Sequence, residues 1–280
     1  SLTKHSDKVL GIAADILLNP AFPQDELDKK KKRAFSSLKS LATNADAIAG
    51  RVTSVLKYGK DHPYGEVQMK SDIENITIDA CKEYYNTYFR PNISYLVIVG
   101  DITVEDAKVL TEKYLGSWEK ADVPEHKYEM PSVTKGVRVA FVNKPGAVQS
   151  VIKVIYPVDY KVGAPDAAAV SVMSSIFGGA FSSYLNANLR EDKAYTYGAR
   201  GGIRADNRVG SFNAGASVRN EVTDSSVTEF LFEMNHIINE KPSQTDLDRI
   251  KNNMNGGFAL SLESDQTIAR FALNIERYGL

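Results

Sequence analysis

Apolar residues recur at helical spacing through most of the first half of the chain, with polar residues between them. This spacing predicts helices over residues 7–19, 25–41, 46–58, 77–89 and 103–115. Thr77 and Thr103 occupy favoured capping positions, and Asp106 completes a capping box with Thr103. The apolar run Tyr95–Val99 predicts a strand, whereas residues 62–75 predict a turn followed by a polar loop.

The second half of the chain alternates between strand and helix patterns. Apolar runs predict strands over residues 137–142, 149–156 and 209–218. Helical spacing predicts helices over residues 166–177, 181–190, 223–239, 245–261 and 265–278. Residues 116–135 combine glycine and prolines with charges and are the best linker candidate. We predict an α+β fold with helices packed on one face of a mostly antiparallel sheet, divided into residues 1–127 and 128–280.

The stretch from Ile176 to Gly202 carries the most informative polar positions. Gly178 and Gly179 are expected to break the chain after an apolar helix that ends near Phe177. Arg190 then ends a short helix, and Tyr197 enters a strand in which it shares a side with Tyr195 and Ala199. A guanidinium and a phenol delivered close together suit binding to the backbone carbonyls of an extended peptide. The alternative is that both are ordinary surface residues.

The two ends of the chain resemble each other at a constant offset of 220 residues. The matches are Leu27 with Leu247, Asp28 with Asp248, Lys31 with Lys251, Ile48-Ala49 with Ile268-Ala269, and Tyr58-Gly59 with Tyr278-Gly279. Self-similarity at a fixed offset is typical of duplicated units, here whole domains. We therefore expect the latter part of a first domain, most of a second, and residues missing at both ends. A complete protein with two similar helical ends is the alternative.

Composition excludes several classes of partner and site. The formal net charge is −1, and the only basic cluster, Lys29–Arg33, lies on a predicted helix, so we predict no nucleic-acid partner. Cys81 is the single cysteine, which rules out a disulfide framework or a cysteine zinc knuckle within this chain. No apolar run approaches membrane-span length, and no signal peptide is visible.

The motifs resemble those of the insulinase/pitrilysin zinc metallopeptidases, also called inverzincins. The central stretch is similar to their second-domain motif at Gly178, Gly179, Leu189, Arg190, Glu191 and Tyr197. First-domain similarity covers Asn19-Pro20, His62-Pro63-Tyr64-Gly65, Tyr88-Phe89-Arg90-Pro91-Asn92 and Val99-Gly100-Asp101. The resemblance implies duplicated α+β domains that face each other around a peptide chamber. It also implies that Arg190 and Tyr197 form a substrate-binding pair, with the glycines in a turn.

The same resemblance implies that zinc is bound elsewhere. Catalytic members carry an H-x-x-E-H helix and a distal Glu ligand. The four histidines here, His5, His62, His126 and His236, do not have that spacing. The distal position falls near Ser37, and serine is a poor replacement for a carboxylate on zinc. We therefore expect no catalytic or metal-binding residue in this segment, and zinc in a partner subunit or a fused half.

Three functions compete at this point. The first is a non-catalytic, substrate-binding segment of a zinc metalloendopeptidase assembly, which resembles the inactive halves of bacterial members. The second is part of an active enzyme whose H-x-x-E-H half lies upstream of Ser1. The third is a non-proteolytic scaffold on the same fold. Bacterial members are often exported, so the periplasm or cell envelope is one possible location, but no address is visible in the sequence.

Overall fold

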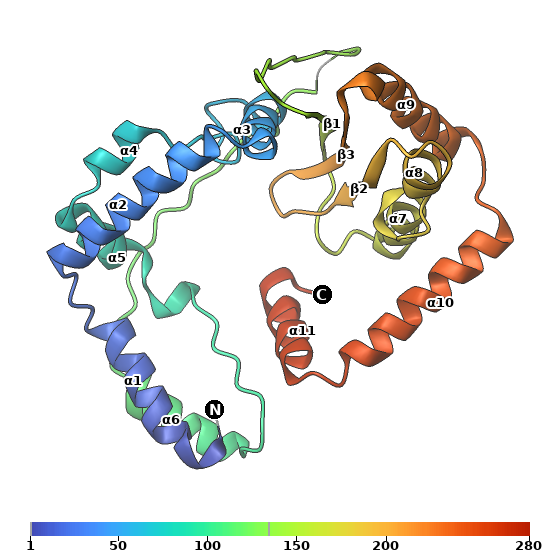
Figure 1. Cartoon of the computed structure of the whole chain (residues 1–280). Helices are drawn as coiled ribbons and strands as arrows, with labels where there is room; N and C mark the ends of the chain where they lie inside the picture. The colour runs from blue at the N-terminus through green and yellow to red at the C-terminus, as the bar shows by residue number, and fades with distance from the viewer. Residues whose placement is uncertain (1, 134) are drawn as a thin grey trace. The chain divides into compact units, whose positions relative to one another are not determined.

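The computed structural model describes residues 2–133 and 135–280 (Figure 1). In the first half, the helices predicted from apolar spacing are confirmed as α1 (Ser6–Leu18), α2 (Gln24–Leu41), α3 (Ala45–Tyr58), α5 (Ile78–Tyr88) and α6 (Val104–Leu115). The predicted caps are also present. The hydroxyl of Thr77 accepts a hydrogen bond from the amide of Ala80, and that of Thr103 accepts one from the amide of Asp106.

One helix in this half is missing from the sequence prediction. Residues Lys70–Asn75 form the short helix α4, where a polar loop was expected. The Asp72 carboxylate accepts a hydrogen bond from the Met69 amide at 2.6 Å, and Ile73 is buried. A cap and one buried apolar residue therefore fix six residues that are too few to show helical periodicity.

Two predicted strands do not form among the described residues. Tyr95–Val99 and residues 137–142 are extended but belong to no ladder, so both predictions are wrong here. Val137, Val139 and Phe141 are more than four-fifths exposed. A β-strand needs backbone hydrogen bonds to a neighbouring strand. Without such a neighbour, the N–H and C=O groups of an apolar run are not paired in a sheet.

The sheet has three antiparallel strands in the order β1-β3-β2, which confirms the α+β class. They are β1 (Gln149–Val158), β2 (Thr196–Arg204) and β3 (Gly210–Arg219). Further helices are α7 (Ala167–Ser174), α8 (Tyr184–Asn186), α9 (Thr223–Asn239), α10 (Gln244–Ser261) and α11 (Asp265–Tyr278). The last three agree with the predicted helices to within one residue.

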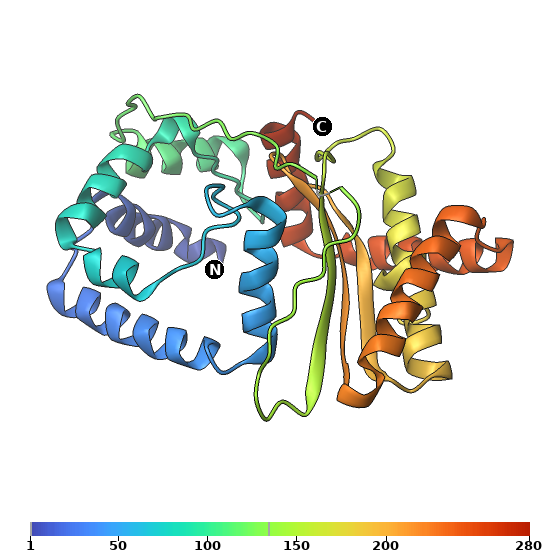
Figure 2. The ribbon, with the colours of Figure 1, turned by 90° about the horizontal axis from the view of Figure 1, so that it is seen from above.

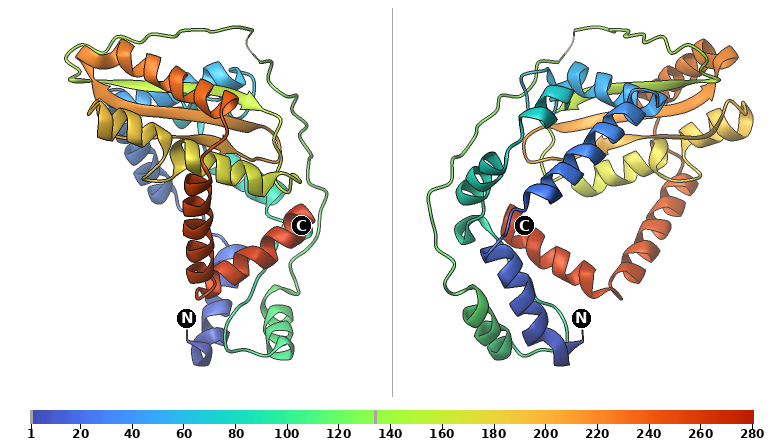
Figure 3. Two further views of the ribbon diagram at one scale, coloured as in Figure 1. Left: turned by 90° about the vertical axis from the view of Figure 1, so that its right-hand side faces the viewer. Right: turned by 60° about the vertical axis from the view of Figure 1, so that its left-hand side comes forward.

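Each face of this sheet packs against different helices. Alternate residues of β3, from Phe212 to Val218, point into a buried cluster with Leu185 of α8 and Phe230 of α9. On the other face, the β3 residue Asn213 accepts a hydrogen bond from Lys57 of α3 at 2.9 Å. In Figure 2 the sheet lies between α3 and the α7–α9 group, and Figure 3 shows the two sides in turn.

The chain separates into two compact units that interleave along the sequence. Unit 1 comprises Ser1–Ser37, Met69–Lys127 and Phe258–Leu280, and unit 2 comprises Leu38–Gln68 and Tyr128–Gly257. The sheet and α3 therefore belong to one unit. The division into sequence domains 1–127 and 128–280 stays a prediction.

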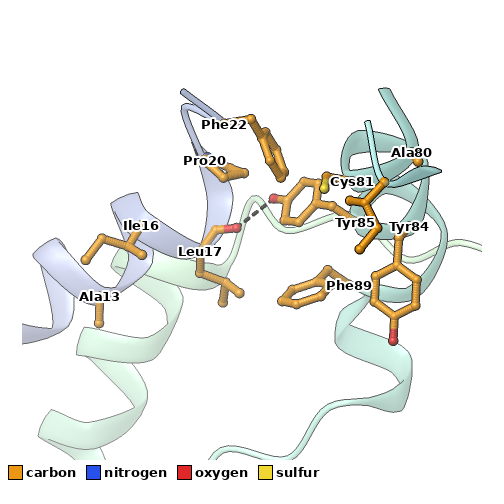
Figure 4. Close-up of a pocket in the computed structure, with 11 residues that line it drawn as sticks. Ala13, Ile16, Leu17, Pro20, Phe22, Ala80, Cys81, Tyr84, Tyr85 and Phe89 are labelled. Carbon is orange, nitrogen blue, oxygen red and sulfur yellow. Dashed lines mark hydrogen bonds between the residues drawn. The ribbon is translucent and has the colours of Figure 1, made fainter. Parts of the chain in front are cut away.

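Unit 1 contains an apolar groove of about 690 Å³ between α1 and α5. Figure 4 shows Leu17 of α1 next to Phe89, and the Tyr85 hydroxyl donates a hydrogen bond to the Leu17 carbonyl at 2.6 Å. Cys81, a half-buried free cysteine, lies in the wall of this groove.

Candidate functional site

The glycine pair forms the last two residues of the helix that begins as α7. Residues Ser175–Gly179 form a π-helical turn that continues α7, so the helix ends after Gly179, two residues beyond the predicted end near Phe177. A β-carbon on Gly178 would lie 2.3 Å from the amide nitrogen of Gly201 on β2. Glycine is therefore required at position 178, because the backbones of the π-helical turn and β2 are in direct contact there. This contact sets the position from which the chain continues toward α8.

The helix after the glycines is shorter than predicted. Residues 181–183 are not helical, α8 covers only Tyr184–Asn186, and a second π-helical turn follows over Ala187–Asp192. Leu185 and Leu189 are completely buried, as the apolar pattern predicts. The wider π-helical turn brings Arg190 to the end of the helix with one-third of its side chain exposed.

A sharp turn and a bulge then bring the chain to Tyr197. Ala194 has a φ of 51°, and β2 loses its regular register with β3 between Thr196 and Ala199. Tyr197 is 93% exposed, whereas Ala199 is completely buried. The expectation that these two share a side is therefore wrong, because the bulge breaks strand alternation. Tyr195 packs against the core, as an aromatic filler would.

Asn186 connects the helix to the bulged strand. Its side-chain oxygen accepts a hydrogen bond from the amide of Ala199 at 2.9 Å, and its side-chain nitrogen donates one to the carbonyl of Ala180 at 3.2 Å. Asn186 is 2% exposed, so both bonds are shielded from water. Asn186 is not among the predicted site residues, although an asparagine between apolar helix positions indicates a buried polar contact.

The Arg190 guanidinium contacts Phe181 and Glu191. The guanidinium carbon lies 4.3 Å from the centre of the Phe181 ring, and a terminal nitrogen lies 3.4 Å from the carboxylate of Glu191. Tyr197 presents its phenol to solvent from the bulge seven residues later. Joint binding of one ligand by Arg190 and Tyr197 stays a prediction.

A polar cluster connects α8 and the π-helical turn after it to α9. The Asn188 side chain donates hydrogen bonds to the carboxylates of Glu229 at 2.9 Å and Glu233 at 2.7 Å. Glu233 also pairs with His236, whose ring stacks on Tyr184. Burial raises the pKa of the Tyr184 phenol, and the nearby Asp246 and Glu233 carboxylates raise it further. These contacts connect the segment before Arg190 to α9.

The donors present do not fit a catalytic metal site. Among the described residues, no group of three or more His, Cys, Asp or Glu side chains is placed to hold a metal ion. Ser37, the expected third-ligand position, is exposed on α2.

His62 is a turn residue, in agreement with the sequence interpretation. Its Nδ1 accepts a hydrogen bond from the amide of Tyr64, and its ring packs against Tyr58, Tyr64 and Tyr128. Its buried Nε2 has no hydrogen-bond partner. Burial lowers the pKa of His62, nearby Arg208 lowers it further, and Asp206 opposes the shift.

Acid is therefore expected to destabilise the protein through His62. The unfolded chain takes up a proton near the ordinary pKa of 6.5, while the folded state resists it until lower pH. The His62 contribution to stability is complete above that value and is lost as the pH falls below it. Urea unfolding measures the free energy of unfolding at about pH 7.5 and about pH 5.5. The decrease between the two pH values should be smaller for His62→Phe than for the unmodified chain. Equal losses would contradict this assignment.

One described stretch, Ala167–Asp192, is long and apolar enough to cross a membrane. However, Phe177, Leu185 and Leu189 within it are buried in the unit 2 cluster, and the chain leaves the helical conformation at 181–183. We therefore assign it to the core of unit 2.

Comparison with known proteins gives a consistent family and fold. The family model described as the peptidase M16 inactive domain matches residues 75–254. The zinc protease PqqE of Helicobacter pylori is 26% identical over 223 residues, which are 74% of this chain and 48% of that protein. The uncharacterized zinc protease YmxG of Bacillus subtilis is 23% identical over 202 residues, covering 70% of this chain and 47% of that protein.

A solved structure gives the same result for the fold. The peptidase M16 inactive domain from Pseudomonas fluorescens superposes with a TM-score of 0.88 at 22% identity, covering 100% of this chain and 66% of that one. The chain spans about half the length of the curated relatives it matches.

Proposed function

The chain belongs to the peptidase M16 inactive-domain family, and on this premise we propose that it is the non-catalytic, peptide-binding part of a zinc metalloendopeptidase assembly. Arg190 and Tyr197 bind the backbone of an extended peptide substrate. A catalytic partner subunit or fused half supplies the zinc. The observation that carries the proposal is that a helix end and a bulged strand present a partly exposed guanidinium and an exposed phenol.

The chemistry of the two side chains supports this assignment. A guanidinium offers five N–H donors in a planar fork, and a phenol donates one O–H. Backbone carbonyls of an extended peptide are acceptors at regular spacing along one edge. Two such donors therefore hold a peptide in one register without selecting its side chains.

Zinc chemistry belongs to the other part of the assembly. His62 packs among tyrosines and His236 pairs with Glu233, and among the described residues neither belongs to a group of three or more His, Cys, Asp or Glu side chains that could hold a metal ion. When zinc is bound in the other half, it activates a water for attack on the peptide bond. The contribution of this chain is to place the substrate.

The proposal includes the duplication inferred from the sequence. Subtracting 220 from the bounds of α10 and α11 gives the bounds of α2 and α3 exactly, which supports a repeated unit. The copies differ in their surroundings. Residues of α3 are half-buried, whereas Ile268 and Ile275 of α11 are 44% and 52% exposed.

Removal of either donor is expected to weaken peptide binding. Arg190→Ala should lower affinity for a fluorescein-labelled mixture of random 12-residue peptides by about tenfold, because a charge-assisted hydrogen bond is lost. Tyr197→Phe should lower it by about threefold, the value of one neutral bond. Fluorescence anisotropy measures both affinities.

Matched controls use residues elsewhere in the chain. Arg277→Ala removes an arginine that lies over the ring of Tyr278, and Tyr84→Phe removes an exposed phenol of α5. Both should bind peptide as the unmodified chain does. Unchanged affinity in Arg190→Ala and Tyr197→Phe, or stoichiometric zinc bound by this chain alone, would overturn the proposal.

The relatives named as zinc proteases favour a second candidate, in which this chain is part of an active enzyme. Metal analysis of the full-length gene product separates the two candidates. Zinc bound by an H-x-x-E-H helix in the same domain as residues 1–127 favours the active enzyme, whereas zinc bound only in a separate subunit or another fused half favours the inactive half.

A further inference from the structure

Phe181 is a large apolar side chain in an exposed position beside Arg190. It is 66% exposed, and the Arg190 guanidinium carbon lies 4.3 Å from its ring centre. We propose that Phe181 is a positioning residue, which holds the Arg190 guanidinium in place for contact with a peptide. This inference rests on the proposed function of Arg190 and deepens it.

The backbone around Phe181 is anchored. The amide of Ala180 donates a hydrogen bond to the carbonyl of Ser175 at 3.0 Å, and the Ala180 carbonyl accepts one from buried Asn186. Ser183, two residues after Phe181, is completely buried. The aromatic ring therefore projects from a short segment that is fixed on both sides.

The backbone before and after Arg190 is equally restrained. Leu189 is completely buried, and its carbonyl accepts a hydrogen bond from the amide of Tyr195 at 2.8 Å. The amide of Lys193 donates to the carbonyl of Asn188 at 3.0 Å. Backbone hydrogen bonds and buried residues therefore set the positions of Phe181 and Arg190, which are nine residues apart. The contact between the ring and the guanidinium follows from this backbone arrangement.

The contact has a direct consequence for binding. A guanidinium over an aromatic face is attracted by the ring quadrupole and keeps the N–H donors at its edge available. An arginine already held in one place loses less side-chain freedom when it binds a ligand. The competing Glu191 carboxylate is well exposed and weakens the positioning little, because solvent screens such pairs.

Substitutions at position 181 distinguish the effect of the aromatic ring from the effect of a large apolar side chain. Phe181→Leu keeps an apolar side chain but removes the ring, and it should weaken binding of the random peptide mixture by about two- to fivefold. Phe181→Tyr keeps an aromatic face and should restore the affinity. Phe232→Leu on α9 is the matched control, because Phe232 is similarly exposed at 58%, and its affinity should not change.

A spectroscopic measurement tests the contact itself. In the unmodified chain the side-chain Nε–Hε NMR signal of Arg190 should show an upfield ring-current shift, which Phe181→Leu removes and Phe181→Tyr retains. Circular dichroism should give the same melting temperature for all three proteins, because the ring is largely outside the core. The chemical shift of the Arg190 Nε–Hε signal in the unmodified chain shows whether the contact exists, even if the leucine variant does not fold.

The outcomes distinguish this inference from the function on which it rests. If Arg190→Ala leaves affinity unchanged, the proposed function fails. If Arg190→Ala weakens binding but Phe181→Leu does not, only the positioning role of Phe181 fails. An Arg190 signal at its ordinary position in the unmodified chain also overturns the positioning role.

Discussion

Gly178→Ala is expected to lower the free energy of unfolding by about 3 kcal/mol. The added β-carbon would lie 2.3 Å from the amide nitrogen and 2.8 Å from the α-carbon of Gly201. Both are backbone atoms, so no rotamer change relieves the clash, and Gly178 is buried. The π-helical turn and β2 would have to separate. Urea-induced unfolding followed by circular dichroism measures the change.

Gly257→Ala provides the matched control for this substitution. Gly257 lies in α10, and nothing stands within 4 Å of the position of its β-carbon. Alanine should stabilise the helix there by up to about 1 kcal/mol, because it restricts the unfolded chain more than glycine does. If both substitutions changed stability alike, the close backbone contact between Gly178 and Gly201 would be disproved.

Asn186→Ala is expected to cost about 2 to 3 kcal/mol of stability. The substitution leaves the buried amide of Ala199 without its acceptor, and it removes the donor to the Ala180 carbonyl. An unpaired buried amide costs more than a hydrogen bond exchanged with water. Since Ala199 lies at the end of the bulge that presents Tyr197, peptide binding should weaken as well.

Hydrogen exchange gives the most local readout of this effect. The Ala199 amide should exchange faster in Asn186→Ala than in the unmodified chain, with the global free energy of unfolding taken into account. Asn239→Ala is the control, because its exposed side chain donates only to the Asn235 carbonyl in α9. It should change stability by no more than about 0.5 kcal/mol. An unchanged exchange rate at Ala199 would contradict the bridging role of Asn186.

Long helices were predictable because their apolar faces repeat over several turns. The bounds of α3, α9 and α11 lie within one residue of the predicted ones. Helix α4 escaped prediction because a single buried residue, Ile73, anchors it. The runs at 95–99 and 137–142 have strand composition, but composition contains no information on whether a pairing strand is present.

The candidate site was only partly predictable for a related reason. Arg190 and Tyr197 could be named because a recognisable motif surrounds them. Their setting depends on contacts between residues far apart in sequence, such as Gly178 with Gly201 and Asn186 with Ala199. Periodicity has no access to such contacts, nor to the π-helical turns and the bulge that alter local register.

The interleaving of the two units affects how a break in the linker would act. Residues 38–68 precede the linker, yet they belong to the same unit as the sheet that follows it. Lys57 donates to Asn213, and the Tyr64 hydroxyl donates to the carboxylate of Asp206. A protease nick between residues 116 and 127 would therefore not release two separate fragments. The severed pieces would stay joined by non-covalent contacts within unit 2, like the halves of a split protein.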